Sequence, residues 1–77
     1  MDRATICKKV AAIVSETLEV DEDTISEDLR FEELGADSFD LLELVTALED
    51  EFDLTMDDDS LGQIATVGDV VDAIQNA

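Results

Sequence analysis

Residues 34–52 constrain this chain more than any other stretch, because they contain a complete helix with its start signal. Gly35 lets the backbone turn sharply, since glycine has no Cβ. Asp37 and Ser38 follow, and both are residue types that accept hydrogen bonds from the free N–H groups of a first helical turn. The pattern therefore predicts a helix over residues 38–52. Its inward stripe is predicted to be Leu41, Val45, Leu48 and Phe52, and Leu42 and Leu44 either widen this stripe or lie at its edges.

Ser38 has two interpretations. It is either an ordinary helix cap or a hydroxyl to which a phosphate is attached, because a helix start carries partial positive charge and suits an anion. The chain has no histidine, so a Ser-His-Asp arrangement is excluded and Ser38 has no obvious base to activate it. We therefore expect a site of modification and not an enzyme.

The rest of the chain also reads as helical. Residues 2–18 carry apolar side chains at spacings of three and four, and Thr66 with Asp69 three residues later indicates the start of a last helix. A short, weak third helix is predicted at residues 60–64. Between the first two helices, residues 19–36 form a long connection in which apolar side chains interrupt the acids. We expect these side chains to pin the connection to the core.

The charge balance restricts the partners of the chain. It has 22 acidic and 4 basic residues, which gives a net charge of −18. Nucleic acid is excluded as a partner because binding it depends on Lys and Arg neutralising phosphates, and an anionic membrane surface is disfavoured for the same reason. We expect basic protein surfaces as partners, a monomer, and low stability at low salt.

Cysteine, metal-binding and membrane signals are weak. Cys7 is the only cysteine, so an internal disulfide is excluded, and we expect a half-buried structural role in a protein of the reducing cytoplasm. Neither a signal peptide nor an apolar stretch of transmembrane length is apparent. The acidic stretches 21–26 and 57–68 each lack ligand positions of a calcium loop, so we expect loose divalent binding and no metal site.

Several motifs together resemble an acyl carrier protein, and they span nearly the whole chain. Leu34-Gly35-Ala36-Asp37-Ser38, with Leu41, Glu43 and Leu48 downstream, is similar to the prosthetic-group site of that family. Residues 31–34, 49–54 and 66–74 are similar to its approach to the serine, the end of its second helix and its last helix. Phe39 departs from the pattern because the family usually has leucine there, which concerns partner specificity and not attachment.

The resemblance implies both a fold and a function. The fold is all-α, a small antiparallel four-helix bundle with a short third helix, formed by residues 1–77 as a single domain. The resemblance implies that Ser38 carries 4′-phosphopantetheine as a phosphodiester, donated by coenzyme A through a phosphopantetheinyl transferase. The thiol of this arm would hold acyl intermediates as thioesters and present them to enzymes of fatty-acid biosynthesis.

Further site residues are predicted near Ser38. The acids of residues 38–52 are either a solvated face or a partner-binding surface. Those near the end of the helix oppose its dipole, so local stability does not explain them, which favours partner binding. The resemblance implies that they meet Lys and Arg side chains on partner enzymes. The predicted docking residues are Asp37, Asp40, Glu43, Glu49 and Asp50. A second set either opens to shelter an acyl chain or simply forms core. These residues are Leu48, Phe52, Met56, Ile64, Val70 and Ile74.

Alternatives remain open on the sequence alone. Within the same class, the chain fits a carrier for polyketide or nonribosomal peptide synthesis, or one specialised for a single acid. High acidity and the lack of flanking linkers favour a free-standing carrier of the fatty-acid type. From other classes, the chain fits an unmodified acidic helical adaptor for basic proteins, or a low-affinity calcium buffer. Phe39 either stays exposed beside the arm or tucks against Phe31.

Overall fold

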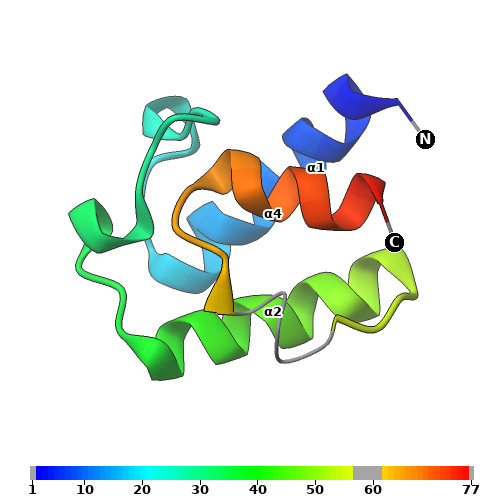
Figure 1. The fold of residues 1–77 in the computed structure, drawn as a ribbon. Coiled ribbons are helices and arrows are strands. Elements are labelled where there is room, and N and C mark those ends of the chain that lie inside the picture. Colours follow the sequence, from blue (N-terminus) through cyan, green and yellow to red (C-terminus); the bar gives the residue numbers. More distant parts are fainter. Residues whose placement is uncertain (1, 57–61, 77) are drawn as a thin grey trace.

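The computed structural model describes residues 2–56 and 62–76, and the regular structure within them is entirely helical (Figure 1). The α-helices are α1 (Arg3–Leu18), α2 (Ser38–Phe52) and α4 (Val67–Gln75). Two 3₁₀ turns, η1 (Glu22–Thr24) and η2 (Phe31–Leu34), lie in the connection between α1 and α2. The predicted all-α class is confirmed. Of the short helix predicted at residues 60–64, the first two residues lie outside the described residues.

Each α-helix begins where the sequence supplies a cap. At the start of α1, Asp2 Oδ1 accepts a hydrogen bond from the Thr5 N–H at 2.8 Å. At the start of α4, the Thr66 and Asp69 side chains each accept a hydrogen bond from the backbone N–H of the other. Because these bonds satisfy free N–H groups within a few residues of sequence, the starts of the helices are fixed locally.

The core lies where the three helices meet η2. Its buried side chains are Ile6, Val10 and Val14 of α1, Phe31 of η2, Leu44, Val45 and Leu48 of α2, Val67, Val70, Val71 and Ile74 of α4, and Met56. Leu44 is fully buried, whereas the sequence placed it in a widened part of the stripe or at its edge, and Leu41 and Phe52 are only half-buried. Periodicity predicts that α2 has an apolar face, but the positions of α1 and α4 decide which leucine lies at its centre.

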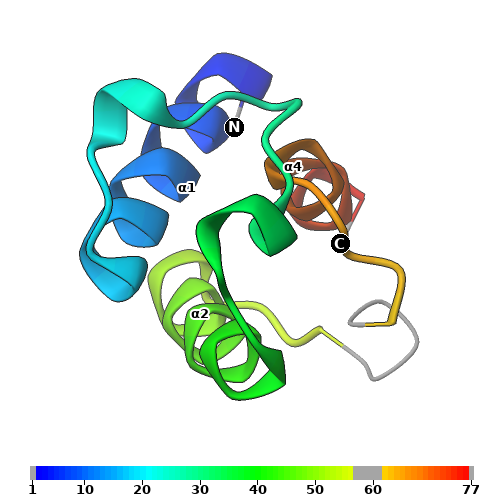
Figure 2. The same cartoon turned by 90° about the vertical axis from the view of Figure 1, so that its left-hand side faces the viewer.

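The long connection is pinned to the rest of the protein, as expected. The Phe31 side chain lies in the core, and its N–H donates to the Ala65 carbonyl at 3.0 Å. The Gly68 N–H donates to the Glu27 carbonyl at 2.9 Å. These bonds hold the connection against the segment that leads into α4. As a result, η2 closes the end of the bundle at which α2 begins (Figures 1 and 2).

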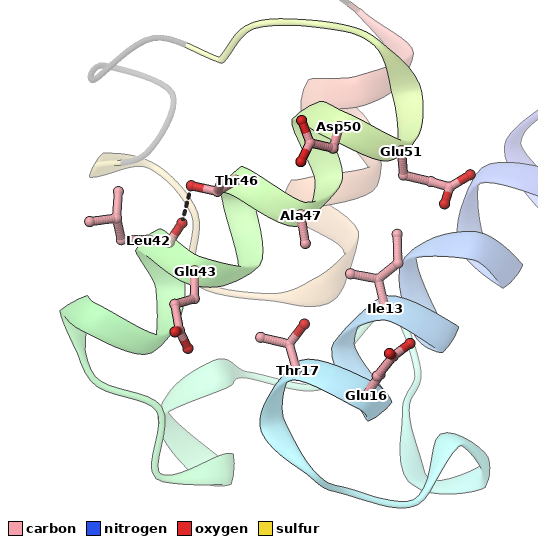
Figure 3. A pocket seen from close by; sticks show the side chains of 9 residues that line it. All are labelled: Ile13, Glu16, Thr17, Leu42, Glu43, Thr46, Ala47, Asp50 and Glu51. Carbon is pink, nitrogen blue, oxygen red and sulfur yellow. Dashed lines mark hydrogen bonds between the residues drawn. The ribbon is translucent and has the colours of Figure 1, made fainter.

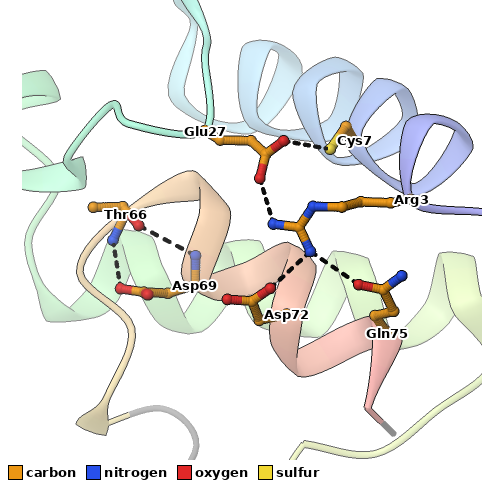
Figure 4. A network of polar contacts seen from close by, with 7 residues as sticks. All are labelled: Arg3, Cys7, Glu27, Thr66, Asp69, Asp72 and Gln75. Carbon is orange, nitrogen blue, oxygen red and sulfur yellow. Dashed lines mark hydrogen bonds and ion pairs between the residues drawn. The ribbon is translucent and has the colours of Figure 1, made fainter.

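A polar network centred on Arg3 joins α1, the connection and α4 (Figure 4). The Arg3 guanidinium donates to a Glu27 carboxylate oxygen, to Asp72 Oδ1 at 2.7 Å and to Gln75 Oε1 at 2.9 Å. The hydrogen bond from Arg3 lowers the pKa of Glu27. Cys7 Sγ donates to the same carboxylate at 3.4 Å, and burial raises the pKa of this half-buried thiol. Cys7 is therefore half-buried, as expected.

Candidate functional site

Ser38 is the first residue of α2, and its side chain is exposed. Just upstream, Gly35 ends η2 in the left-handed region with φ 74°, a conformation that glycine adopts without strain. The chain turns there toward the start of α2, and Asp37 is the residue that caps the helix. The backbone thus holds the Ser38 hydroxyl at the mouth of a helix, at the end of the bundle closed by η2.

Asp37 and Asp40 form a capping box on either side of Ser38. Asp37 Oδ1 accepts a hydrogen bond from the Asp40 N–H at 3.0 Å, and Asp40 Oδ2 accepts one from the Asp37 N–H at 3.3 Å. The ordinary capping role therefore belongs to Asp37. Within residues 2–56 and 62–76 the Ser38 hydroxyl makes no side-chain hydrogen bond, so the cap does not occupy it.

Two hollows meet at Ser38. One encloses about 330 Å³ between α2 and α4, and the other encloses about 410 Å³ on the side of η2. The first is mainly apolar and is lined by Ser38, Leu41, Leu42, Leu44, Val45, Gly62, Ile64 and Val70. The second includes the charged side chain of Arg30, and both are lined by Leu41 and Ile64. A chain attached to Ser38 Oγ therefore has an apolar hollow and a hollow of mixed polarity beside it.

The residues predicted to shelter an acyl chain lie at different depths. Ile64 and Val70 line the hollow of 330 Å³. Leu48 is fully buried in the core, and Phe52 is half-buried. The remaining two, Met56 and Ile74, are buried with 8% and 7% of their surface exposed. The structure thus brings two members of the set next to Ser38 and places the others away from that hollow.

Besides Ser38, Leu42 and Gly62, three further lining residues of this hollow were absent from the set predicted to shelter an acyl chain. They are Leu41, Leu44 and Val45 of α2, which face the segment before α4. Leu41 and Val45 follow Ser38 at spacings of three and seven residues, and such positions lie on the same side of a helix. The positions of Leu41 and Val45 beside Ser38 could therefore have been predicted from this spacing. The contribution of Leu44 was not predictable, because it depends on where α4 lies.

The predicted docking acids differ in their exposure and in the hydrogen bonds that their carboxylates accept. Asp37, Glu43 and Asp50 are exposed, whereas Asp40 and Glu49 are half-buried. Asp40 belongs to the capping box, and Glu49 Oε2 accepts a hydrogen bond from the Met56 N–H at 2.9 Å. That bond holds the segment after α2, so Glu49 has a structural role. The other acids leave carboxylate oxygens open to solvent along α2.

Phe39 lies in solvent beside Ser38. Its side chain is 66% exposed, whereas Phe31 is 2% exposed within the core. Of the two orientations considered from the sequence, the exposed one is therefore present. Leu42, one turn further along α2, is 55% exposed. These two side chains give the start of α2 an apolar surface next to the Ser38 hydroxyl.

The sequence has no histidine to serve as a base near Ser38. In the described part of the chain, no group of three or more Cys, Asp or Glu side chains is placed to hold a metal ion. None of the helices described is both long enough and apolar enough to cross a lipid bilayer.

Comparisons with known proteins agree with this geometry. A family model described as "Phosphopantetheine attachment site" matches residues 8–74. An acyl carrier protein of Sulfurovum sp. (strain NBC37-1) is 50% identical over 68 residues, which is 87% of this chain and 91% of the relative. An acyl carrier protein of Thermotoga maritima is 46% identical over 74 residues, which is 95% of this chain and 91% of the relative.

Solved structures show the same fold. The crystal structure of an acyl carrier protein from Thermotoga maritima matches with a TM-score of 0.84 at 37% identity, covering 99% of this chain and 89% of that one. An acyl carrier protein from Enterococcus faecalis matches with a TM-score of 0.80 at 36% identity, covering 99% of this chain and 98% of that one.

The family model and the solved structures match this all-helical chain along most of its length, and together they define a phosphopantetheine-dependent carrier. The exposed Ser38 at the mouth of α2 is its candidate attachment residue. The chain belongs to the acyl carrier protein family. Proteins of this family carry covalently attached phosphopantetheine; they are carriers and not catalysts. The protein accordingly interacts with enzymes that process the attached acyl group.

Proposed function

We propose that Ser38 is the residue that carries 4′-phosphopantetheine. The observation that carries the proposal is the exposed hydroxyl of Ser38 at the mouth of α2, next to an Asp37 that already supplies the cap. A phosphodiester there would meet the partial positive charge of the first helical turn. The residues present fit the group, because both hollows beside Ser38 leave room for an attached chain. When bound, its terminal thiol supplies the atom to which an acyl group is joined as a thioester.

Attachment of phosphopantetheine to Ser38 requires an enzyme that supplies a general base for the serine hydroxyl. The chain has no histidine, and the neighbouring carboxylates of Asp37 and Asp40 are engaged in the capping box. We propose that a phosphopantetheinyl transferase supplies this base. The Ser38 oxygen loses its proton to the base and bonds to the phosphorus of the phosphopantetheine, the pyrophosphate bond of coenzyme A breaks, and adenosine 3′,5′-bisphosphate leaves. Ser38 contributes only the hydroxyl oxygen, held in solvent where the transferase reaches it.

The apolar hollow is the proposed shelter for the part of an acyl chain nearest the arm. Its position supports this role, since it begins at Ser38 and is lined by Leu44, Ile64 and Val70. Leu48, Met56 and Ile74 of the predicted set are buried in the core and do not line this hollow. A longer chain would reach them only if α2 and α4 moved apart.

The acidic side chains along α2 are the proposed docking surface for basic surfaces of partner enzymes. Their exposure and the net charge of −18 support this role. The proposed set remains Asp37, Asp40, Glu43, Glu49 and Asp50, with Glu49 supporting the surface through its bond to the backbone of Met56. Docking by complementary charge is fast and sensitive to salt, which suits a carrier that visits successive enzymes. Self-repulsion of this surface also supports a monomer.

The pathway and the cellular location are further proposals. Two relatives named simply "Acyl carrier protein" match this chain along nine-tenths of their length, which supports a role in fatty-acid biosynthesis. Masses of the acyl groups isolated on the protein test this role. Saturated chains that differ by two carbons support it, and aminoacyl or polyketide groups contradict it. A cytoplasmic location stays a prediction, supported by the single cysteine that forms no internal disulfide.

Intact-mass measurement after incubation with coenzyme A and a phosphopantetheinyl transferase tests the attachment site. The wild-type protein is expected to gain one phosphopantetheine, and Ser38→Ala is expected to gain none. Ser26→Ala is the matched control, because Ser26 is also exposed but lies in the long connection, and it is expected to load normally. Absence of any gain on the wild type would favour the acidic adaptor or the calcium buffer instead.

A further inference from the structure

An open groove between α1 and α2 takes no part in the proposed attachment site (Figure 3). It encloses about 890 Å³ and shares only Leu42 with the hollow of 330 Å³ beside Ser38. On α2 it extends over residues 42–51, a rise of about 14 Å along the helix axis. The groove is therefore long enough to accept an extended or helical segment of another protein.

The floor of the groove is apolar. Ile13 and Thr17 from α1 point toward α2, and Ala47 from α2 points back between them (Figure 3). Ala47 is small, so it leaves space that a longer side chain would fill. Thr46 donates its hydroxyl to the Leu42 carbonyl at 2.9 Å, which satisfies that polar group within α2. The exposed side chain of Leu42 continues the apolar surface at one end.

The rims of the groove are acidic on both sides. Glu16 lies on α1, Glu43 and Asp50 lie on α2, and all three are exposed. Across residues 2–56 and 62–76, none of these three forms an ion pair. Glu51 does so at one end, where its Oε2 lies 3.7 Å from Lys9 Nζ. Like charges therefore face each other across an apolar floor, and cationic groups placed along both rims would offset their repulsion.

We propose that this groove is a docking surface for a basic amphipathic helix of a partner protein. Apolar side chains of that helix would rest on Ile13 and Ala47, and flanking Lys or Arg side chains would meet the acidic rims, which is the helix-in-groove mode of recognition. The charge of the rims excludes nucleic acid and disfavours a second copy of this chain. The proposal rests on the proposed docking role of Glu43 and Asp50, and it adds α1 to that surface.

Docking in this groove leaves the attachment site accessible. Leu42 at the near end of the groove lies one helical turn beyond Ser38, and the Ser38 hydroxyl lines the other two hollows instead. A partner is thus able to hold the carrier by α1 and α2 while the arm on Ser38 extends elsewhere. A partner bound in the groove therefore does not need to contact the start of α2.

NMR titration of the ¹⁵N-labelled protein with a synthetic peptide tests the proposal. The probe is an amphipathic helical peptide with a leucine stripe flanked by lysines, and a scrambled peptide of the same composition is its control. Chemical-shift changes are expected to concentrate at Ile13, Thr17 and Ala47, and the scrambled peptide is expected to bind about tenfold more weakly. Equal binding of both peptides, or changes confined to residues 37–40, would overturn the proposal.

Two variants sharpen the test. Ala47→Met fills the floor without changing the charge and is expected to weaken binding of the probe about tenfold. Its matched control is Ala4→Met, because Ala4 is exposed on α1 outside the groove. If circular dichroism shows that Ala47→Met does not fold, Glu16→Gln replaces it, and Glu22→Gln on η1 is the matched control. Glu16→Gln is likewise expected to weaken binding of the probe, whereas Glu22→Gln is not. If the groove variant binds the probe with unchanged affinity, the docking proposal is wrong. Loading of Ser38, measured by intact mass, tests the attachment site independently of this result.

Discussion

At the scale of single residues, Asp37 and Ser38 have separate roles. Asp37 caps α2, and Ser38 keeps its hydroxyl free of the cap. Asp37 accepts the hydrogen bond from the Asp40 N–H, so the helix start is satisfied without the serine. The Ser38 hydroxyl consequently remains in solvent at a helix mouth. Had Ser38 been the cap, its oxygen would have been held against the backbone, where attachment of a group would compete with folding of the helix.

Gly68 shows how tightly the long connection packs against α4. A Cβ at this position would lie 3.0 Å from the Glu27 carbonyl oxygen and 3.5 Å from the Glu27 Cβ. That carbonyl is backbone held by a hydrogen bond from the Gly68 N–H at 2.9 Å, so it has little freedom to move away. We expect Gly68→Ala to lower the free energy of unfolding by about 1–3 kcal/mol, as overpacking does. Urea unfolding monitored by circular dichroism measures this change.

Gly62→Ala is the control for this substitution. A Cβ on Gly62 would have no neighbouring atom within 4 Å, so the added methyl is expected to be neutral or to stabilise the protein by about 0.4–1 kcal/mol. If the two variants were equally stable, the connection would not be held against α4 as tightly as the structure shows.

At the scale of elements, the start of α4 links stability to pH through Asp69. Its Oδ2 accepts hydrogen bonds from the Ala65 N–H at 2.9 Å and the Thr66 N–H at 3.0 Å, and these bonds lower the pKa of the carboxyl below its ordinary value of 3.8. Because the pKa is lower in the folded state, the charged carboxylate stabilises the fold above pH 3.8. This contribution is lost as the pH falls through the folded-state pKa.

Asp69→Asn tests this linkage because it removes the charge and keeps the size of the side chain. The difference in free energy of unfolding between the wild type and the variant is expected to be full at neutral pH and to shrink as the pH falls below 3.8. Urea unfolding at a series of pH values measures it. A difference that stays constant down to the lowest pH would show that the charge of Asp69 contributes nothing.

The helices were predictable from the sequence, whereas their mutual contacts were only partly so. The bounds of α2 and the starts of α1 and α4 follow from caps such as Asp37 and Thr66, which act within one turn. The burial of Leu44 and the hydrogen bond between Phe31 and Ala65 join segments far apart in the sequence. The periodicity of apolar residues does not predict contacts between segments that are far apart in the sequence. For the same reason the local motif predicts Ser38 as the candidate site residue, whereas it does not predict the hollows beside Ser38.

At the scale of the whole molecule, Arg3 is a clamp between three parts of the chain. It binds Glu27 of the connection and Asp72 of α4, and the side-chain hydrogen bonds to these two carboxylates raise its pKa. Arg3→Gln is expected to lower the melting temperature, with a larger effect at low salt because the pairs are partly exposed and screened by ions. Lys8→Gln is the control, since it removes the same charge from an exposed side chain that forms no ion pair with any described residue. Equal melting temperatures for the two variants would contradict the clamp.

The net charge of −18 acts on the whole fold at once. Self-repulsion of this charge disfavours the compact state, and salt screens it over a Debye length of about 10 Å at 0.1 M. The wild-type protein is therefore expected to melt at a higher temperature as sodium chloride is raised, and still higher with a divalent cation at the same ionic strength. Thermal unfolding followed by circular dichroism measures both series. Melting temperatures that do not change with salt would contradict a stability limited by repulsion.

The role of Ser38 as the attachment residue is tested most directly by locating the modification within the chain. The protein is produced together with a phosphopantetheinyl transferase, digested, and its fragments are sequenced by tandem mass spectrometry. The account predicts one phosphopantetheine on the fragment that contains Ser38, with fragment ions that place it on that residue. A group found on another residue, or an unmodified Ser38 in protein made beside an active transferase, would contradict the account.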